Sequence, residues 1–114
     1  MASILLSEAD PDVRRLLVVL LERLGHEAIV LGGGPEMPPP ADLLLLEPAS
    51  PEHLEQALLA RELDPALPIV CVSVLPAEAR FLALGPLAYL AKPFTFEELH
   101  ATIQSALASA GCPA

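Results

Sequence analysis

Polar side chains stand at the ends of four short apolar runs in this chain of 114 residues. Two acidic residues, Glu8 and Asp10, follow the first of these runs, and Glu47 ends another. Ser73 closes a further run, and Lys92, which is the only lysine, follows the last. Carboxylates hold hard divalent cations, whereas a hydroxyl and an ammonium group contact phosphate oxygens. If these groups meet in space, they would form a site for a cation and a phosphoryl group.

The apolar runs are predicted to be the strands of one parallel sheet. Four consecutive leucines at 43–46, bounded by turn-forming residues, are typical of a strand that is buried on both faces. Open α/β sheets place their chemistry at the carboxyl ends of the strands, which is where the polar groups follow the runs. The predicted strands are 3–7, 27–31, 42–47, 69–73 and 87–91.

Helices are predicted between most of these strands. The first helix is predicted to begin at Asp10-Pro11, with Asp10 as its N-cap and Pro11 at its first position, and to end at Gly25. One apolar face of this helix carries Val13, Leu16, Leu17, Leu20, Leu21 and Leu24. Ser50-Pro51 begins the next helix, with Leu54, Leu58 and Ala57 as its inward residues.

The second half of the chain is predicted to hold a short helix at 76–84 and a final helix that begins at Thr95. Glu98 lies three residues after Thr95, so the two can form a capping box. By contrast, Gly32–Pro40 contains three glycines and four prolines, which cannot form a helix because proline lacks the amide donor. The alternation of strand and helix predicts an α/β fold with helices on both faces of the sheet.

Composition narrows the range of functions. The net charge of −9 repels phosphate backbones, so we expect no nucleic-acid binding. No apolar run approaches the roughly 18 residues that span a bilayer, and no signal peptide is evident, so we expect a cytoplasmic protein without membrane contact. Cys71 and Cys112 are interpreted as free thiols, and the three histidines as residues of surface helices or turns. Residues 1–110 form one predicted domain, followed by a tail at 111–114.

Four segments together resemble the receiver domain of bacterial two-component response regulators, in order and in approximate spacing. They are 4–17, 42–47, 68–73 and 89–94, and the segment Tyr89-Leu-Ala-Lys92-Pro-Phe94 is the most specific of them. The resemblance implies the flavodoxin-like three-layer fold with a five-stranded parallel sheet in the order 2-1-3-4-5. The second helix of that family is missing, and Gly32–Pro40 takes its place.

The resemblance also assigns roles to individual residues. Glu47 stands where the family has its phosphoacceptor aspartate. Ser73 matches the switch hydroxyl, Tyr89 the aromatic switch position and Lys92 the lysine that contacts phosphate. Glu8 matches the first member of the family's acidic pair.

Two departures from the family pattern weaken phosphotransfer. Ala9 stands where the family has a direct metal ligand, and the following Asp10 does not usually ligate the metal itself. Mg²⁺ tolerates a poor ligand set badly. The additional methylene of Glu47 moves its carboxylate outward by about 1.5 Å, and a misplacement of about 1 Å can cost roughly 10²-fold in rate.

Three interpretations of Glu47 remain open at this point: a phosphoacceptor, a mimic of the phosphorylated state, or a remnant neutralised by Lys92. We expect an ion pair between Glu47 and Lys92. We therefore expect a stand-alone degenerate receiver, or pseudo-receiver, that acts in signal transduction through protein contact, without aspartyl phosphorylation, enzymatic activity or cofactor. Its partner would be another protein, a histidine kinase included, or a second copy of the chain. The expected contact face combines the fourth helix, fifth strand and fifth helix, with Phe81, Leu82, Tyr89 and His100.

Two alternatives are kept. In the first, the receiver still accepts phosphate in a phosphorelay and binds Mg²⁺. In the second, the chain is a small flavodoxin-like ligand-binding domain, whose pocket would lie at the strand ends in the space left by the missing helix.

Overall fold

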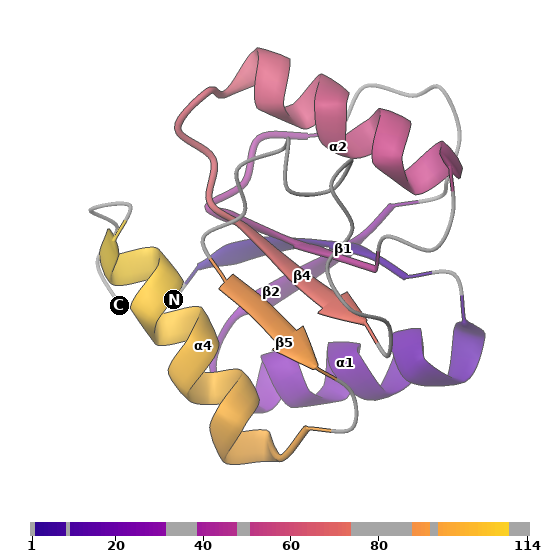
Figure 1. Ribbon diagram of the computed structural model, residues 1–114. Coiled ribbons are helices and arrows are strands. Elements are labelled where there is room, and N and C mark those ends of the chain that lie inside the picture. Colours follow the sequence, from indigo (N-terminus) through magenta and orange to yellow (C-terminus); the bar gives the residue numbers. More distant parts are fainter. Residues whose placement is uncertain are drawn as a thin grey trace.

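A five-stranded parallel sheet forms the centre of the molecule, in the order β2-β1-β3-β4-β5 (Figure 1). The computed structural model describes residues 2–8, 10–31, 39–47, 51–73, 88–91 and 94–109, with the backbone alone for 51–54, 73, 88–89 and 91. The strands are β1 (Ser3–Ser7), β2 (Glu27–Val30), β3 (Leu43–Leu46), β4 (Ile69–Ser73) and β5 (Ala88–Ala91). The helices are α1 (Pro11–Arg23), α2 (Pro51–Leu63) and α4 (Phe96–Ser109). The predicted fold class and strand order are confirmed.

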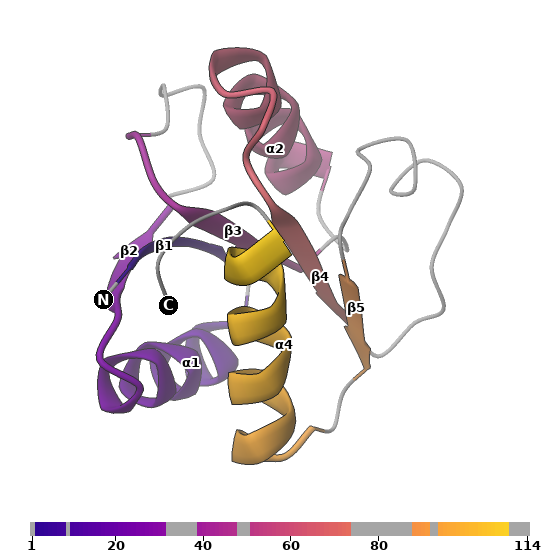
Figure 2. The same cartoon turned by 90° about the vertical axis from the view of Figure 1, so that its left-hand side faces the viewer.

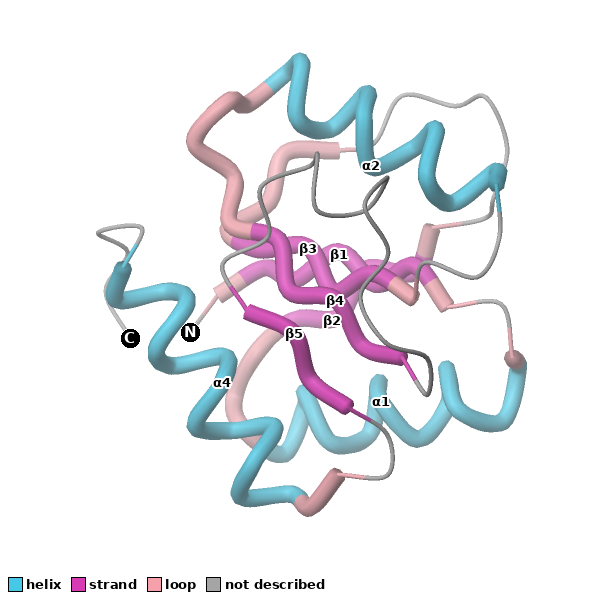
Figure 3. Tube along the Cα trace, in the orientation of Figure 1, coloured by secondary structure: helices cyan, strands magenta, loops and turns pink. Residues whose placement is uncertain are grey.

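The helices form two outer layers. Figure 2 shows α1 and α4 on one face of the sheet and α2 on the other, and the tube in Figure 3 follows the same three layers. Each face has its own set of packed apolar side chains. The α1–α4 core includes Ile4, Leu6, Leu17, Leu21, Leu43, Leu45, Val70, Val72, Leu99, Ile103 and Leu107. The α2 core includes Leu5, Leu31, Leu44, Leu46, Ala57, Ala60, Leu67, Ile69 and Cys71.

The four leucines of β3 behave as predicted for a strand covered on both sides. All four are buried, and alternate residues enter the α1–α4 core and the α2 core. The edge strand β2 differs, because its residues are only half-buried or exposed. The centre of the sheet is therefore rigidly packed, whereas β2 is less covered.

Local signals start and end the helices as predicted. The Asp10 carboxylate accepts the backbone N–H of Asp12 and Val13, which caps α1. At the other end of α1, Gly25 follows the C-cap Leu24 with φ 86°, a left-handed conformation that glycine adopts without strain. In front of α4, Thr95 and Glu98 exchange hydrogen bonds of 3.0 and 3.1 Å, which is the predicted capping box.

Three burial predictions are wrong. Leu16 is 55% exposed, because Leu17 and Leu21 define the inward direction of α1 and Leu16 lies about 100° away from it. Leu58 is 49% exposed, since the inward face of α2 is made by Gln56, Ala57 and Ala60. His26 is buried rather than on the surface, and its Nδ1 accepts the backbone N–H of Ala2 at 3.1 Å.

Other predictions concern parts of the chain that the structure does not describe. The helix at 76–84, the tail at 111–114 and most of the Gly32–Pro40 loop lie outside the described residues. The strands predicted at 27–31, 42–47 and 87–91 are each one or two residues longer than β2, β3 and β5. Within the described residues, no helix has the length and apolarity needed to cross a membrane.

Candidate functional site

Two buried carboxylate residues lie side by side where β1 and β3 end. We call this side of the sheet, where the parallel strands finish, the carboxyl edge, and the opposite side the amino edge. Ser7 pairs with Leu46, and the backbone N–H of Glu47 donates to the carbonyl of Ser7 at 2.8 Å. This register places Glu8 next to Glu47. Glu8 is 3% exposed and Glu47 is 8% exposed, so both carboxylates are largely removed from water.

Asp10 has a different task from these two residues. Its Oδ1 accepts the N–H of Asp12 at 2.9 Å and of Val13 at 3.3 Å, and its side chain is exposed. A carboxylate that caps a helix satisfies amide donors and offsets the positive end of the helix dipole. Asp10 therefore serves as the N-cap of α1, and the acidic pair of the carboxyl edge consists of Glu8 and Glu47.

The loop after β1 is held by hydrogen bonds to Glu8. Its Oε1 accepts the backbone N–H of Asp10 at 3.4 Å, and its backbone carbonyl accepts Nη1 of Arg14 at the same distance. Arg14 was not among the predicted site residues. Its position in the first turn of α1, after Asp10, is the signal that could have identified it, because that turn lies beside the loop.

A thiol on β4 lies within the electric field of Glu47. Cys71 pairs with Leu46, the residue before Glu47, and is a buried free cysteine. Burial, and secondly the negative charge of Glu47, raise the pKa of the Cys71 thiol to about 11. The thiol is therefore protonated at neutral pH, and the field of Glu47 extends across β3 to β4.

Ser7 is a second residue at this edge that the sequence patterns did not identify. Its side chain is buried, and its Oγ has no hydrogen-bond partner among the residues described. A buried hydroxyl without a partner costs about 1–3 kcal/mol. Its occurrence at the end of an apolar strand, beside Glu8, is the signal that could have identified it.

The remaining predicted site residues are placed only in part. Ser73 ends β4 and Tyr89 lies in β5, where it pairs with Cys71, but their side chains are outside the described part. Ala9 and Lys92 also lie outside the described residues. The ion pair between Glu47 and Lys92 therefore stays a prediction.

The described residues do not fit a Mg²⁺ ion well. Among them, no group of three or more His, Cys, Asp or Glu side chains lies close enough together to hold a metal ion. Glu8 and Glu47 supply two carboxylates at the carboxyl edge, and the Asp10 carboxylate is used as a helix cap. Mg²⁺ requires near-ideal octahedral geometry, which two glutamates alone provide poorly.

The fold and the carboxyl-edge site define a class of α/β signalling domain, and the comparisons name the family. No protein-family model matches the chain. The response regulator receiver protein CpdR of Brucella abortus is 33% identical over 124 residues, which cover 96% of this chain and 100% of CpdR. The chain therefore belongs to the response regulator receiver family.

Solved structures show the same fold at lower identity. A CheY-like receiver domain of Methanospirillum hungatei superposes with a TM-score of 0.80 at 21% identity, with 97% of both chains covered. The receiver domain of the sensor histidine kinase PA1611 of Pseudomonas aeruginosa, solved with a magnesium ion in its active-site cleft, superposes with a TM-score of 0.73 at 20% identity, covering 94% of this chain and 98% of that one. NtrX of Brucella abortus superposes with a TM-score of 0.79 at 20% identity. The match covers 96% of this chain but only 27% of NtrX.

Proposed function

We propose that this chain is a degenerate response-regulator receiver, which acts in signal transduction through protein contact and without aspartyl phosphorylation or catalysis. One observation carries the proposal: the residue at the end of β3 is the buried Glu47, beside the buried Glu8. A glutamate there is longer than an aspartate by one methylene, so its carboxylate extends about 1.5 Å further. It fills part of the space that a phosphoryl group would need.

The surroundings of Glu47 support the same conclusion. A phosphotransfer site would need a metal ion to neutralise the charge that develops on the phosphoryl oxygens. Here Ala9 stands at the position of a carboxylate ligand, and the neighbouring Asp10 caps α1 through two hydrogen bonds. The magnesium ion of the PA1611 receiver belongs to that protein, and this chain offers a poorer set of ligands.

The resting charge at the site is the second part of the proposal. Burial and, secondly, the negative charge of Glu47 raise the pKa of the Cys71 thiol. We propose that the Glu47 carboxylate supplies negative charge at this edge without any phosphorylation. A receiver with such a fixed charge would hold one conformation instead of switching between two. Glu47 then acts as a mimic of the phosphorylated state or as a remnant neutralised by Lys92.

A permanently set receiver transmits its signal by binding. The partner we propose is a protein of a two-component system, such as a histidine kinase, or a second copy of the chain. The proposed contact face includes β5 and α4, where Phe96 is an exposed aromatic and His100 is half-buried. Exposed aromatic side chains are enriched at interface hot spots.

The direct test is chemical phosphorylation. The purified chain is incubated with acetyl phosphate and Mg²⁺, and its intact mass is measured over time. We expect no adduct, because Glu47 is misplaced for in-line attack and the ligand set for Mg²⁺ is incomplete. A stoichiometric phosphate adduct would contradict the proposal and favour the alternative, a receiver that still accepts phosphate in a phosphorelay.

Restoring the site sharpens the test. In the double variant Glu47→Asp with Ala9→Asp, we expect Mg²⁺-dependent phosphorylation to appear in a measurable fraction of molecules. The matched control is Asp10→Asn, which removes a nearby carboxylate but keeps an oxygen to cap α1. Like the wild type, this variant should show no phosphate adduct. If the double variant stays unmodified, then Ala9 and Glu47 are not what prevents phosphorylation, and this explanation of the degenerate site is wrong.

A further inference from the structure

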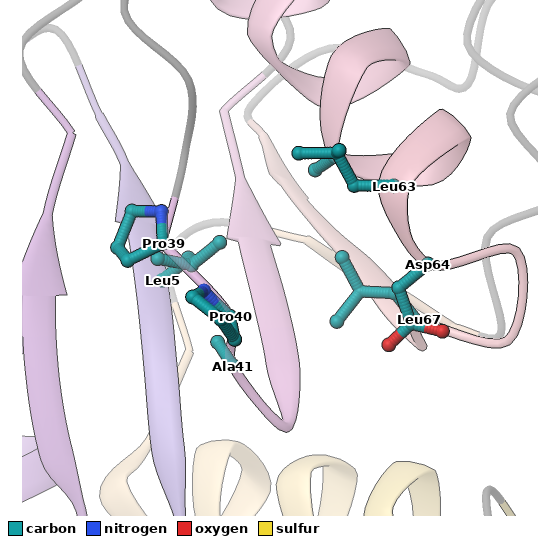
Figure 4. A pocket seen from close by; sticks show the side chains of 8 residues that line it. Leu5, Pro39, Pro40, Ala41, Leu63, Asp64 and Leu67 are labelled. Carbon is teal, nitrogen blue, oxygen red and sulfur yellow. The ribbon is translucent and has the colours of Figure 1, made fainter.

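A cavity opens on the α2 face of the sheet, at the amino edge and away from Glu8 and Glu47. Its volume is about 360 Å³. One wall consists of Leu5 of β1 with Pro40 and Ala41, the residues that lead into β3. The other wall consists of Leu63 at the end of α2 and Leu67 before β4. Figure 4 shows the two walls facing each other across the opening.

The cavity follows from the sequence that connects β2 and β3. A crossover between parallel strands usually carries a helix, which packs against the sheet. Here the connection ends in Pro38-Pro39-Pro40, and Pro39 and Pro40 line the cavity in a non-helical conformation. Helix α2 adds little bulk on its side, because its inward residues include Ala57 and Ala60. A proline segment and alanines together leave space that a helix with large side chains would fill.

The chemistry of the lining selects a type of ligand. Most of the lining is aliphatic or proline, and the charged side chain among the described lining residues is Asp64. Its Oδ1 accepts the backbone N–H of Ala66 at 3.1 Å, which fixes the carboxylate at the mouth of the cavity. Arg61 is the cation nearest to Asp64 along the chain. Its Nη1 donates to the backbone carbonyls of Pro65 and Leu67 at 2.9 and 2.6 Å, and it is not among the described lining residues. The chain as a whole carries a charge of −9. A cation would be attracted here and an anion repelled.

From this arrangement we infer that the cavity is a binding site for a small hydrophobic amine. The apolar part of the ligand would lie between Leu5 and Leu67, and its ammonium group would donate to the free oxygen of Asp64. The volume of about 360 Å³ lies at the small end of the range for ligand pockets, which is about 300–1,000 Å³. The site goes beyond the proposed signalling function, because none of the lining residues that the structure describes belongs to the carboxyl edge.

The test uses three probes of the same shape and different charge: 4-phenylbutylamine, 4-phenylbutanol and 4-phenylbutyrate. Each is titrated into the whole chain with labelled leucine methyl groups, followed by NMR. We expect saturable shifts at the methyl groups of Leu5, Leu63 and Leu67. The amine should bind about 3-fold more tightly than the alcohol, because Asp64 is exposed and an ion pair with an exposed carboxylate is weak. The carboxylate should show no saturation.

Two isosteric variants separate a specific carboxylate from the general negative charge. Asp64→Asn keeps an oxygen for the N–H of Ala66 and removes the charge. The affinity for the amine should therefore fall to that for the alcohol. Glu62→Gln removes one carboxylate from the outer side of α2, where Glu62 borders a separate surface hollow with Leu58, and should change the affinity less than 2-fold. Both changes are isosteric and lie on exposed residues, so the fold should be kept.

A filling variant tests the cavity itself. In Ala41→Phe, a large ring enters the space beside Leu5, and amine binding should be lost. If that variant does not fold, the comparison of Asp64→Asn with Glu62→Gln still decides. The inference is overturned if the three probes bind equally, if the shifts map to the carboxyl edge, or if Asp64→Asn and Glu62→Gln have the same effect.

Discussion

The two faces of the sheet are packed in different ways, although the same strands supply both. The α1–α4 core is filled by large aliphatic side chains, among them Leu17, Leu21, Leu99 and Ile103, all of which are buried. On the other face, α2 contributes Ala57 and Ala60, and a cavity of about 360 Å³ remains beside Leu67. The inward residues of α1 and α4 are large and aliphatic, whereas those of α2 include two alanines and border a pocket at the amino edge.

The α1–α4 face supplies most of the large buried side chains, whereas the α2 face has the pocket in which a ligand could bind. The alanines of α2 make fewer dispersion contacts with the sheet than the leucines and isoleucine of α1 and α4. The face with α1 and α4 contributes the larger buried aliphatic side chains. The α2 face can then carry a cavity at the amino edge without unfolding the domain.

The largest expected effect comes from truncating matched side chains in the two cores. Ile103→Ala should lower the free energy of unfolding by about 3–4 kcal/mol, because it opens a new cavity in a filled core. Leu67→Ala should cost only about 2 kcal/mol, since Leu67 borders a pocket that is open to solvent, and its truncation enlarges this pocket instead of creating a new buried cavity. Urea denaturation followed by circular dichroism measures both. Equal costs would show that the two faces are packed alike.

A smaller effect is expected at the start of α4, the helix that anchors the filled face. Thr95→Ala removes the Oγ1 that accepts the N–H of Glu98, and should cost about 1 kcal/mol of stability. Thr95→Ser, which keeps the hydroxyl, is the control and should stay close to the wild type. Hydrogen exchange at the first turn of α4 should accelerate in the alanine variant alone. Unchanged exchange there would argue that packing of Leu99 is enough to hold the turn.

The smallest expected effect is a pH dependence at the turn between α1 and β2. Burial, the charge of the amino terminus and His100 lower the pKa of His26 below its ordinary value of 6.5. The unfolded chain therefore binds this proton more readily than the folded one. The contribution of neutral His26 is present above pH 6.5 and is lost as the pH falls through the lowered pKa.

His26→Asn provides the matching control for this pH effect. Asparagine keeps an oxygen near the position of Nδ1 to accept the N–H of Ala2, and it does not titrate. Between pH 8 and pH 5.5, the wild type should lose more of its free energy of unfolding than the variant. Parallel pH curves for the two proteins would rule out His26 as the source.

Most of the fold could be predicted from the pattern of apolar residues and from the residues that start and end helices. The leucine run at 43–46, the Asp10-Pro11 cap and the Thr95 capping box are local signals, and each produced the expected element. Which helical residues face inward was harder to predict. Leu16 and Leu58 are apolar yet exposed, because the docking direction of a helix depends on the residues of the sheet beneath it.

The site could be predicted only as a set of strand ends. Glu8 and Glu47 follow two adjacent parallel strands, and the ends of such strands meet at one edge of the sheet. That the two residues are neighbours therefore follows from the topology alone. The topology does not predict that Asp10 is separate from that pair, because its carboxylate could either cap the helix or join the acidic cluster. In the structure it caps α1. Arg14 and Ser7 carry only a positional signal, beside Asp10 and Glu8, which does not predict their hydrogen bonding. The effect of Glu47 on Cys71 depends on the register of β3 and β4.

By itself, the sequence determined the alternating α/β order, the helix starts and the unusual carboxylate of Glu47, because these depend on residue type and on neighbours along the chain. The tertiary structure alone decided that His26 is buried and that a cavity lies between Leu5 and Leu67. The physical reason is that burial, hydrogen-bond partners and empty volume arise from groups far apart in the chain. Those distances exist only after the helices have packed on the sheet.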